Sequence, residues 1–247
     1  MKYAFKSSKK NFEDLKDFIM AKKSLTLKIV GCISSFLFFS NSAQAEEKNI
    51  DIYGGIGYTN LSGFSFDTSK NVFNKFNGYQ LGLFGLYTFE NDSNLKFSIG
   101  SGLQITKTKN QDTSTDIQNV DSLKANFDYT SFIFHSGINY KLTNSISMYF
   151  LGNFGYTLKN TFNVDLDTND NYARAANNST SYTINNHFFY GATLMGAYKI
   201  SEIFSLGSSF IYNRHTMTLN YKTYPSTVTE RSSFNKYSMN LLFIWSI

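Results

Sequence analysis

Three histidines, His135, His187 and His215, are the residues of this 247-residue chain best suited to acid–base chemistry. His135 is followed by Ser136, but adjacent residues of a strand face opposite sides, so these two side chains cannot act at one site. A buried or loop histidine more often makes structural hydrogen bonds than it performs catalysis. We therefore expect no catalytic residue among them and no enzyme.

His215 also follows Arg214 at the end of an alternating segment, where an acid such as Glu230 could approach it. A histidine, a guanidinium group and a carboxylate that meet at one place could activate water for hydrolysis. This grouping keeps a hydrolytic function open as the third of three alternatives.

One acidic stretch, Asp165-Leu166-Asp167-Thr168-Asn169, has the spacing with which a calcium loop begins. Such a loop needs a glycine next and a bidentate glutamate at its end, but Asp170 and Ala176 stand at these positions. The stretch is therefore interpreted as a solvated acidic loop, and we expect neither a metal nor any other cofactor.

The formal net charge of +5 belongs to the start of the chain. Residues 1–45 hold eight lysines and three acids, whereas the following 202 residues hold 15 basic and 15 acidic groups. A neutral main part lacks the basic surface that nucleic-acid binding needs, so we exclude nucleic acid as a partner.

Residues 1–45 have the features of a secretory leader. Lys22, Lys23 and Lys28 precede an apolar run, residues 29–39, which is too short to span a bilayer as a helix. The run is followed by polar residues and by Ala43-Gln44-Ala45, a small-x-small sequence that predicts cleavage between Ala45 and Glu46. Met20 begins a leader of normal proportions, and we interpret it as the true start.

The single cysteine, Cys32, lies inside this leader. The residues before it resemble a bacterial lipobox, but a lipobox ends the apolar run, whereas here the run continues through Phe39. We interpret Cys32 as part of the discarded signal. The remaining domain, residues 46–247, then has no thiol and no disulfide.

Eight segments of this domain alternate between apolar and other residues, the pattern of β-strands. The chain contains a single proline, which suits a structure made of hydrogen-bonded ladders. The predicted strands are residues 50–60, 76–89, 95–107, 126–142, 146–160, 181–200, 203–215 and 235–247. A ten-stranded arrangement remains the alternative count.

The connections between these strands alternate strictly between long and short. Residues 61–75, 108–125, 161–180 and 216–234 form long polar connections, and 90–94, 143–145 and 201–202 form short ones. Transmembrane up-and-down barrels sort their connections in this way, with tight turns in the periplasm and larger loops outside the cell.

The bulky residues along the predicted strands fall on one face and the small or polar residues on the other. More than twenty large apolar side chains could not fit inside an eight-stranded barrel, so the bulky face must point outward, into lipid. Aromatic residues also gather near both ends of this face, as at the two interfaces of a membrane. We expect Gly, Ser and Asn to fill the interior, with Asp51, Lys96, Lys141 and Lys199 as a polar network at the periplasmic end.

The last eleven residues alternate up to the end of the given sequence, with apolar residues at Tyr237, Met239, Leu241, Phe243, Trp245 and Ile247. This pattern resembles the C-terminal assembly signal of bacterial outer-membrane barrels, although the final residue is Ile247 and not an aromatic one. The whole of residues 46–247 resembles the OmpA/OmpX-type family of small eight-stranded barrels.

The resemblance implies an outer-membrane location with extracellular long loops and periplasmic termini. It also implies lipid, lipopolysaccharide and the barrel-assembly machinery as partners. The first expectation for function is a surface scaffold, adhesin or host-facing antigen that acts through its long loops on a host-cell or matrix ligand. The alternatives are a narrow porin-like conduit for small solutes and, third, an outer-membrane lipid hydrolase or protease.

Export is predicted to remove residues 1–45 and to leave Glu46 as the first residue. N-terminal sequencing of the membrane-bound protein checks this prediction. A lipid-modified Cys32 at the mature N-terminus would contradict it.

Overall fold

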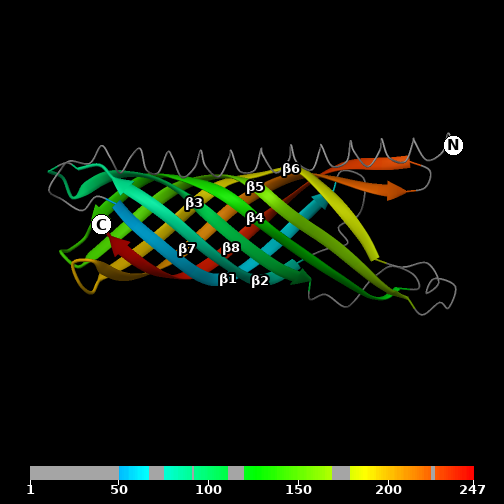
Figure 1. Ribbon diagram of the computed structural model, residues 1–247, viewed down its shortest axis with the longest axis horizontal. Helices are drawn as coiled ribbons and strands as arrows, with labels where there is room; N and C mark the ends of the chain where they lie inside the picture. The colour runs from blue at the N-terminus through cyan, green and yellow to red at the C-terminus, as the bar shows by residue number, and fades with distance from the viewer. Residues whose placement is uncertain (1–49, 67–74, 91, 111–119, 169–178, 224–225) are drawn as a thin grey trace, which may run out of the picture. The chain divides into compact units, whose positions relative to one another are not determined.

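The chain forms a closed β-barrel (Figure 1). The computed structural model describes residues 50–66, 75–90, 92–110, 120–168, 179–223 and 226–247. These residues form antiparallel up-and-down strands: β1 (Ile50–Phe66), β2 (Lys75–Thr88), β3 (Leu95–Asn110), β4 (Val120–Lys141), β5 (Ile146–Thr168), β6 (Ser179–Lys199), β7 (Phe204–Thr223) and β8 (Ser226–Ser246). The predicted all-β, eight-stranded barrel is confirmed. In this part of the chain, no helix is long and apolar enough to cross a membrane.

Some predictions fall on residues that the structure does not describe. The leader with Ala43, Ala45 and Glu46 is one of them, and Cys32 lies within it. Asp170 and Ala176 of the acidic stretch are others. These interpretations stay predictions.

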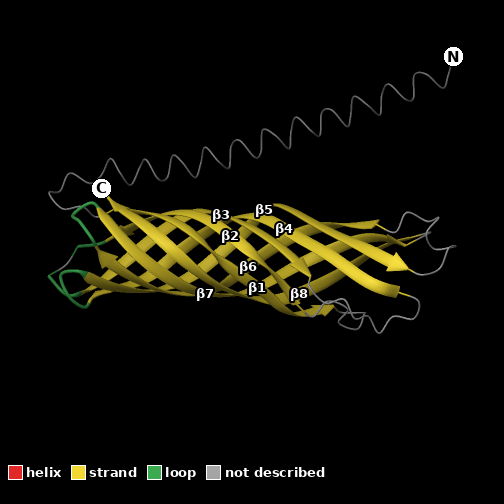
Figure 2. Cartoon of the chain, turned by 90° about the horizontal axis from the view of Figure 1, so that it is seen from below, coloured by secondary structure: helices red, strands yellow, loops and turns green. Residues whose placement is uncertain are grey.

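The three predicted short connections are tight turns at one end of the barrel (Figure 2), which we call the turn end. Phe89, Leu142 and Ile200 each donate a backbone hydrogen bond across their turn, at 2.9–3.0 Å. The Thr143 hydroxyl additionally accepts hydrogen bonds from two backbone N–H groups of its own turn. Such side-chain contacts are the reason why threonine, serine and asparagine favour turns.

Strands β1 and β8 pair with each other and close the ring. Their register places Tyr53 opposite Ile244 and Tyr58 opposite Met239, and the Ile247 N–H donates to the carbonyl of Ile50 at 2.9 Å. Closure leaves the pairing edges of these two strands covered. In the predicted assembly signal, Tyr237, Met239, Leu241, Trp245 and Ile247 are exposed and Phe243 is half-buried.

An apolar belt surrounds the barrel next to the turn end. Phe150 and Leu83 are 58% and 60% exposed. Soluble proteins rarely expose a continuous apolar surface of this extent to water. Other exposed members of the belt are Ile56, Leu81, Leu103, Ile105, Phe134, Ile138, Met148, Phe154, Leu194, Phe210, Met239 and Leu241. The predicted outward direction of the bulky face is confirmed.

Exposed tyrosines mark the limit of the belt away from the turn end. We call Tyr58, Tyr79, Tyr156, Tyr190, Tyr212 and Tyr237 the tyrosine girdle. Tyr58 stands opposite Tyr79, and Tyr212 opposite Tyr237. The residue steps from Tyr79 to Tyr87, at roughly 3.4 Å each on strands tilted by about 40°, cover about 21 Å, close to the apolar height of outer-membrane barrels.

The strands continue well beyond the tyrosine girdle, which corrects the four predicted long loops. β4 begins at Val120, β5 ends at Thr168, and only two residues separate β7 from β8. We call the section of barrel between the tyrosine girdle and these strand ends the extension. The predicted connections 108–125, 161–180 and above all 216–234 were too long, because much of each one is strand.

The extension was missed because its apolar alternation has the opposite phase. In β4, Ala125 and Phe127 point inward while Lys124 and Asn126 face out, whereas within the belt Phe134 faces out. The same reversal occurs in β7, where Met217 is buried between two half-buried threonines, Thr216 and Thr218. The belt is apolar on its outside, and the extension is apolar on its inside.

In other strands, irregular pairing assists the reversal. The register shifts between Ser62 and Ser65 of β1 and between Asn185 and Phe188 of β6. Gly63 and Asn186 adopt positive φ angles of 65° and 49° there, which glycine and asparagine tolerate best. An extra residue of this kind changes which side chains face inward, so a fixed period of two cannot follow the strand through it.

A charge on the outer face of β5 should be costly in the belt and nearly neutral in the extension. Phe150→Arg places a cation in the apolar belt and should cost about 2–4 kcal/mol of unfolding free energy. Thr161→Arg, on the outer face of the extension, should change it by less than about 0.5 kcal/mol. Reversible unfolding titrations in lipid vesicles provide the measurement. Equal costs for the two variants would contradict the assignment of the belt.

Candidate functional site

Inward-facing side chains fill the barrel in successive layers along its axis. The layer at the turn end contains Asp51, whose carboxylate accepts hydrogen bonds from Ser246 Oγ at 2.6 Å and Tyr53 Oη at 3.1 Å. The Tyr149 hydroxyl lies 3.5 Å from the same carboxylate. The rings of the two tyrosines meet edge to face, with centroids 6.2 Å apart.

The predicted network of Asp51 with three lysines is wrong. Lys141 and Lys199 are exposed at their strand ends, and Lys96 is half-buried. Lysines near a strand end can extend into water, which avoids the cost of burying their charge. Asp51 is satisfied by hydroxyl groups instead.

An apolar layer follows, and it corrects the expectation of a small and polar filling. It is formed by Tyr53, Leu86, Tyr149, Leu151, Met195, Leu242 and Ile244, with Phe84 and Ala197 packed against it. Leu242 and Ile244 alternate with the lipid-facing residues of the chain end. Residues 241–245 of β8 are therefore apolar on both faces of the strand.

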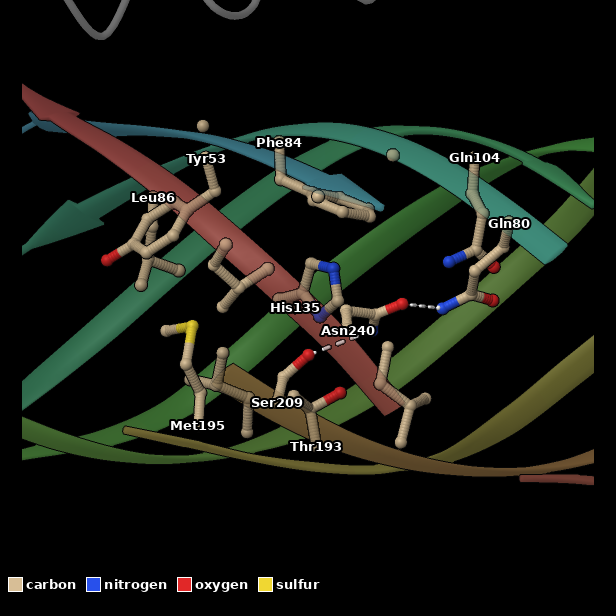
Figure 3. A pocket seen from close by; sticks show the side chains of 16 residues that line it. Tyr53, Gln80, Phe84, Leu86, Gln104, His135, Thr193, Met195, Ser209 and Asn240 are labelled. Carbon is tan, nitrogen blue, oxygen red and sulfur yellow. Dashed lines mark hydrogen bonds between the residues drawn. The ribbon is translucent and has the colours of Figure 1, made fainter. Parts of the chain in front are cut away.

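A small cavity of about 40 Å³ lies between this apolar layer and the next layer along the barrel axis, which is polar (Figure 3). Leu86 and Met195 line its apolar side, and His135, Ser209 and Asn240 line its polar side. This volume holds no more than a few water molecules. The cavity is too small for a substrate.

The polar layer consists of hydrogen-bonded side chains from most of the strands. Gln80 Nε2 donates to Asn240 Oδ1 at 2.6 Å, and Asn240 Nδ2 donates to Ser209 Oγ at 2.9 Å (Figure 3). On the opposite side, His135 Nδ1 lies 2.9 Å from Asn153 Oδ1. His135 is buried while the neighbouring Ser136 is only half-buried, as expected for adjacent residues of one strand.

Lys236 is fully buried in the same layer, a feature that the sequence analysis missed. Its Nζ atom donates to Gln104 Oε1 at 2.6 Å and to Thr106 Oγ1 at 3.2 Å, and it lies 5.4 Å from the centre of the Tyr129 ring. Neutral dipoles and an aromatic face thus stabilise this cation. Its inward position between Phe234 and Ser238 on β8 is the only sign of burial that the sequence holds.

His187 and His215 lie next to each other on the side of the polar layer that faces away from the turn end. His187 Nε2 is 2.9 Å from His215 Nδ1, and His187 Nδ1 is 2.8 Å from Thr157 Oγ1. Phe189 and Phe234 stack on the two faces of the His215 ring at centroid distances of 4.5 and 4.6 Å. Both histidines are buried and enclosed by aromatic rings.

The predicted meeting of His215 with Arg214 and Glu230 does not occur. Arg214 faces the outside of the barrel, where it donates to Asn235 and Ser233. Glu230 pairs with Leu219, four residues along β8 from the residue opposite His215, or roughly 13 Å away. The three groups therefore do not form a catalytic site.

An aromatic core fills the extension. It contains Leu61, Phe64, Phe76, Ala125, Phe127, Tyr129, Phe162, Ile184, Met217, Leu219 and Phe234. Phe64 stacks on Phe234 at 4.6 Å, and Phe127 lies 5.7 Å from Phe162. These contacts make the extension a packed barrel with an apolar core.

The filled interior limits the chemistry that the described part of the protein can perform. The two apolar layers separate the polar layer from both ends of the barrel, so no solute-sized aqueous path crosses the described residues. Among these residues, no group of three histidine, cysteine or acidic side chains could hold a metal ion.

No protein-family model and no curated protein matches the sequence. Among solved structures, the chain is similar to the attachment invasion locus protein Ail of Yersinia pestis, at 14% identity over 81% of this chain and 99% of that one, with a TM-score of 0.38. It is also similar to OprG of Pseudomonas aeruginosa (12% identity, 83% and 98% covered, TM-score 0.43). A third similar structure is the outer membrane protease OmpT of Escherichia coli, at 8% identity over 83% of this chain and 99% of that one, with a TM-score of 0.38.

These likenesses are too distant to carry an argument about function. The predicted resemblance to small outer-membrane barrels is confirmed at the level of the fold, in the number, order and closure of the strands.

The contacts of Lys236 predict a strongly non-additive pair of substitutions. Gln104→Leu leaves the buried cation without its shortest hydrogen bond and should cost about 1.5–3 kcal/mol of unfolding free energy. Lys236→Met in addition should recover most of this loss, because an apolar pair then replaces a buried charge. Unfolding titrations of both single variants and the double variant give the coupling energy. A coupling energy near zero would contradict the described contact.

Proposed function

We propose that this protein is a surface-exposed outer-membrane barrel that acts as a non-enzymatic scaffold or adhesin. The observation that carries this proposal is the extension, a barrel section with its own aromatic core and a polar outer face. Such a section needs no lipid around it, whereas the apolar belt does. A rigid support that stands beyond a membrane is suited to present connecting segments to a partner.

We infer the direction of insertion from the lengths of the connections. Three of the four connections at the end of the extension, residues 67–74, 111–119 and 169–178, are longer than any connection at the turn end, whereas residues 224–225 form a short one. Bacterial barrels have tight turns on the periplasmic side and longer segments outside. In this orientation the termini are periplasmic, the extension is extracellular, and lipid and lipopolysaccharide surround the belt. Residues 237–247 are the proposed recognition segment for the barrel-assembly machinery, after export directed by the proposed leader.

A porin-like conduit is the weaker alternative, because both apolar layers would have to open before a solute could pass. Hydrolysis is weaker still, because His135, His187 and His215 are buried where no substrate can reach them. Binding at the outer end requires no rearrangement of the barrel. The ligand would be a host-cell or matrix component.

Adhesion measurements with trimmed variants test the proposal. A non-adherent laboratory bacterium that displays the chain should bind cultured cells or immobilised matrix. Replacing residues 111–119 and 169–178 by short turns should reduce this binding, while the barrel still assembles, because loop length changes the closure entropy only slowly. Protease protection on whole cells and heat-dependent gel mobility monitor assembly.

A change at the opposite end provides the control. Replacing Thr143-Asn144-Ser145 by Gly-Asn-Gly alters a turn-end connection and should leave adhesion unchanged. Undiminished adhesion after residues 67–74, 111–119 and 169–178 are all trimmed would exclude the adhesin. Solute-sized conductance of the intact chain in planar bilayers would favour the conduit.

A further inference from the structure

The apolar belt has a hollow on its outer face over β1, β2, β3 and β8. Its volume is about 410 Å³, and its lining is almost entirely apolar. Gly54 is one of the residues that line it, and it stands opposite Leu83 of β2 and Phe243 of β8. Because glycine has no side chain, the neighbouring side chains stand around a gap. Leu81, Leu103 and Ile105 border the hollow toward the tyrosine girdle.

Exposed lysines follow on the same face, directly beyond the hollow. Along β3, Lys107 and Lys109 come two and four residues after Ile105, which places them roughly 7 and 14 Å further along the strand. Lys107 stands opposite Tyr79 of the girdle and Lys109 opposite Asn77. Lys75 is exposed at the start of β2, two residues beyond Asn77.

One acid faces this group of lysines. Asp128 of β4 stands opposite Lys107, and its carboxylate accepts a hydrogen bond from the Thr108 N–H at 3.3 Å. On the side of β1, the neighbouring side chains are uncharged: Asn77 accepts hydrogen bonds from Tyr58 and Asn60. Three lysines against one acid leave a positive site at the level where the belt ends.

We propose that this face binds a lipid of the surrounding bilayer whose phosphate-bearing head group has a net negative charge, with an acyl chain in the hollow at Gly54 and a phosphate group at Lys107 and Lys109. The inference rests on the proposed insertion into a membrane. An apolar hollow in line with cations matches an amphiphile with an anionic head group in both chemistry and order along the strand. A soluble polyanion would use the lysines and leave the hollow empty.

A second hollow on the barrel serves as an internal comparison. It has about 440 Å³ and is lined by Met148, Leu194, Gly196, Phe210 and Leu241 among others. The cation beyond it, Arg214, already donates hydrogen bonds to Asn235 and Ser233. The second hollow therefore lacks uncommitted lysines at its rim.

Retention of lipid by the folded barrel tests the assignment. The full mature chain in detergent micelles is titrated with diphosphoryl lipid A and, separately, with phosphatidylcholine, and bound lipid is counted by native mass spectrometry. Wild type should retain diphosphoryl lipid A preferentially. Each lysine near a membrane surface changes such affinity about fivefold, so Lys107→Gln with Lys109→Gln should weaken retention about twenty-five-fold. Asp128→Asn should strengthen it.

Filling the hollow should act on the same lipid without any change of charge. A Cβ atom at Gly54 would lie 3.6 Å from Trp245 and 4.0 Å from the Phe243 carbonyl oxygen, so this position accepts a Cβ atom, and Gly54→Leu should fill part of the gap. Its control is Gly196→Leu in the second hollow, where no atom lies within 4 Å. Lys159→Gln on β5 is the control for the lysines. Both controls should retain lipid as wild type does.

Several outcomes would overturn the proposal. These are equal retention of phosphatidylcholine, unchanged retention in the double lysine variant, or equal losses in Gly54→Leu and Gly196→Leu. Lysine-dependent binding of a soluble sulfated oligosaccharide without lipid retention would also overturn it and indicate a glycan site. Because the titration uses no cells, loss of lipid binding is distinguishable from loss of adhesion.

Discussion

Each strand of this barrel must satisfy two surroundings at once, because its side chains alternate between a narrow interior and the exterior. The exterior changes from lipid to water at the tyrosine girdle, and the apolar residues change sides at the same level. On the turn-end side of the girdle, Phe210 of β7 faces out, and in the extension, Met217 of the same strand faces in. The belt, the extension and the position of the girdle are consequences of this reversal.

The reversal also explains why the interior is closed. In the extension, the core needs aromatic side chains inside to be stable in water, and these block the barrel. In the belt, the interior is free to be polar, and a hydrogen-bonded layer around Lys236 and His135 occupies it. A second apolar layer with Leu242 and Ile244 then separates this polar layer from the Asp51 layer at the turn end. Among the described residues, the barrel thus combines a packed extension with a filled interior.

The sequence predicted the features that a fixed period of two reveals. Leu83, Phe150 and the alternate chain-end residues Tyr237, Met239, Leu241 and Trp245 face out as predicted, and the short turns lie at one end. The extension escaped prediction because its apolar residues follow the opposite phase and because bulges at Gly63 and Asn186 shift the pairing. The interior contacts escaped for a different reason. Lys236 meets Gln104 across 132 residues of sequence, and only the closed ring brings the two together.

The most direct test of this account is to measure the surroundings of single positions along β7. The predicted mature domain contains no cysteine, so spin labels can be attached to single cysteines at Phe210, Met217 and Thr218. In lipid vesicles, a label at Phe210 should collide with oxygen dissolved in the lipid, and a label at Thr218 should collide with a water-soluble nickel chelate. A label at Met217 should be shielded from both. A lipid-exposed Thr218, or a Met217 more accessible than Thr218, would contradict the reversal.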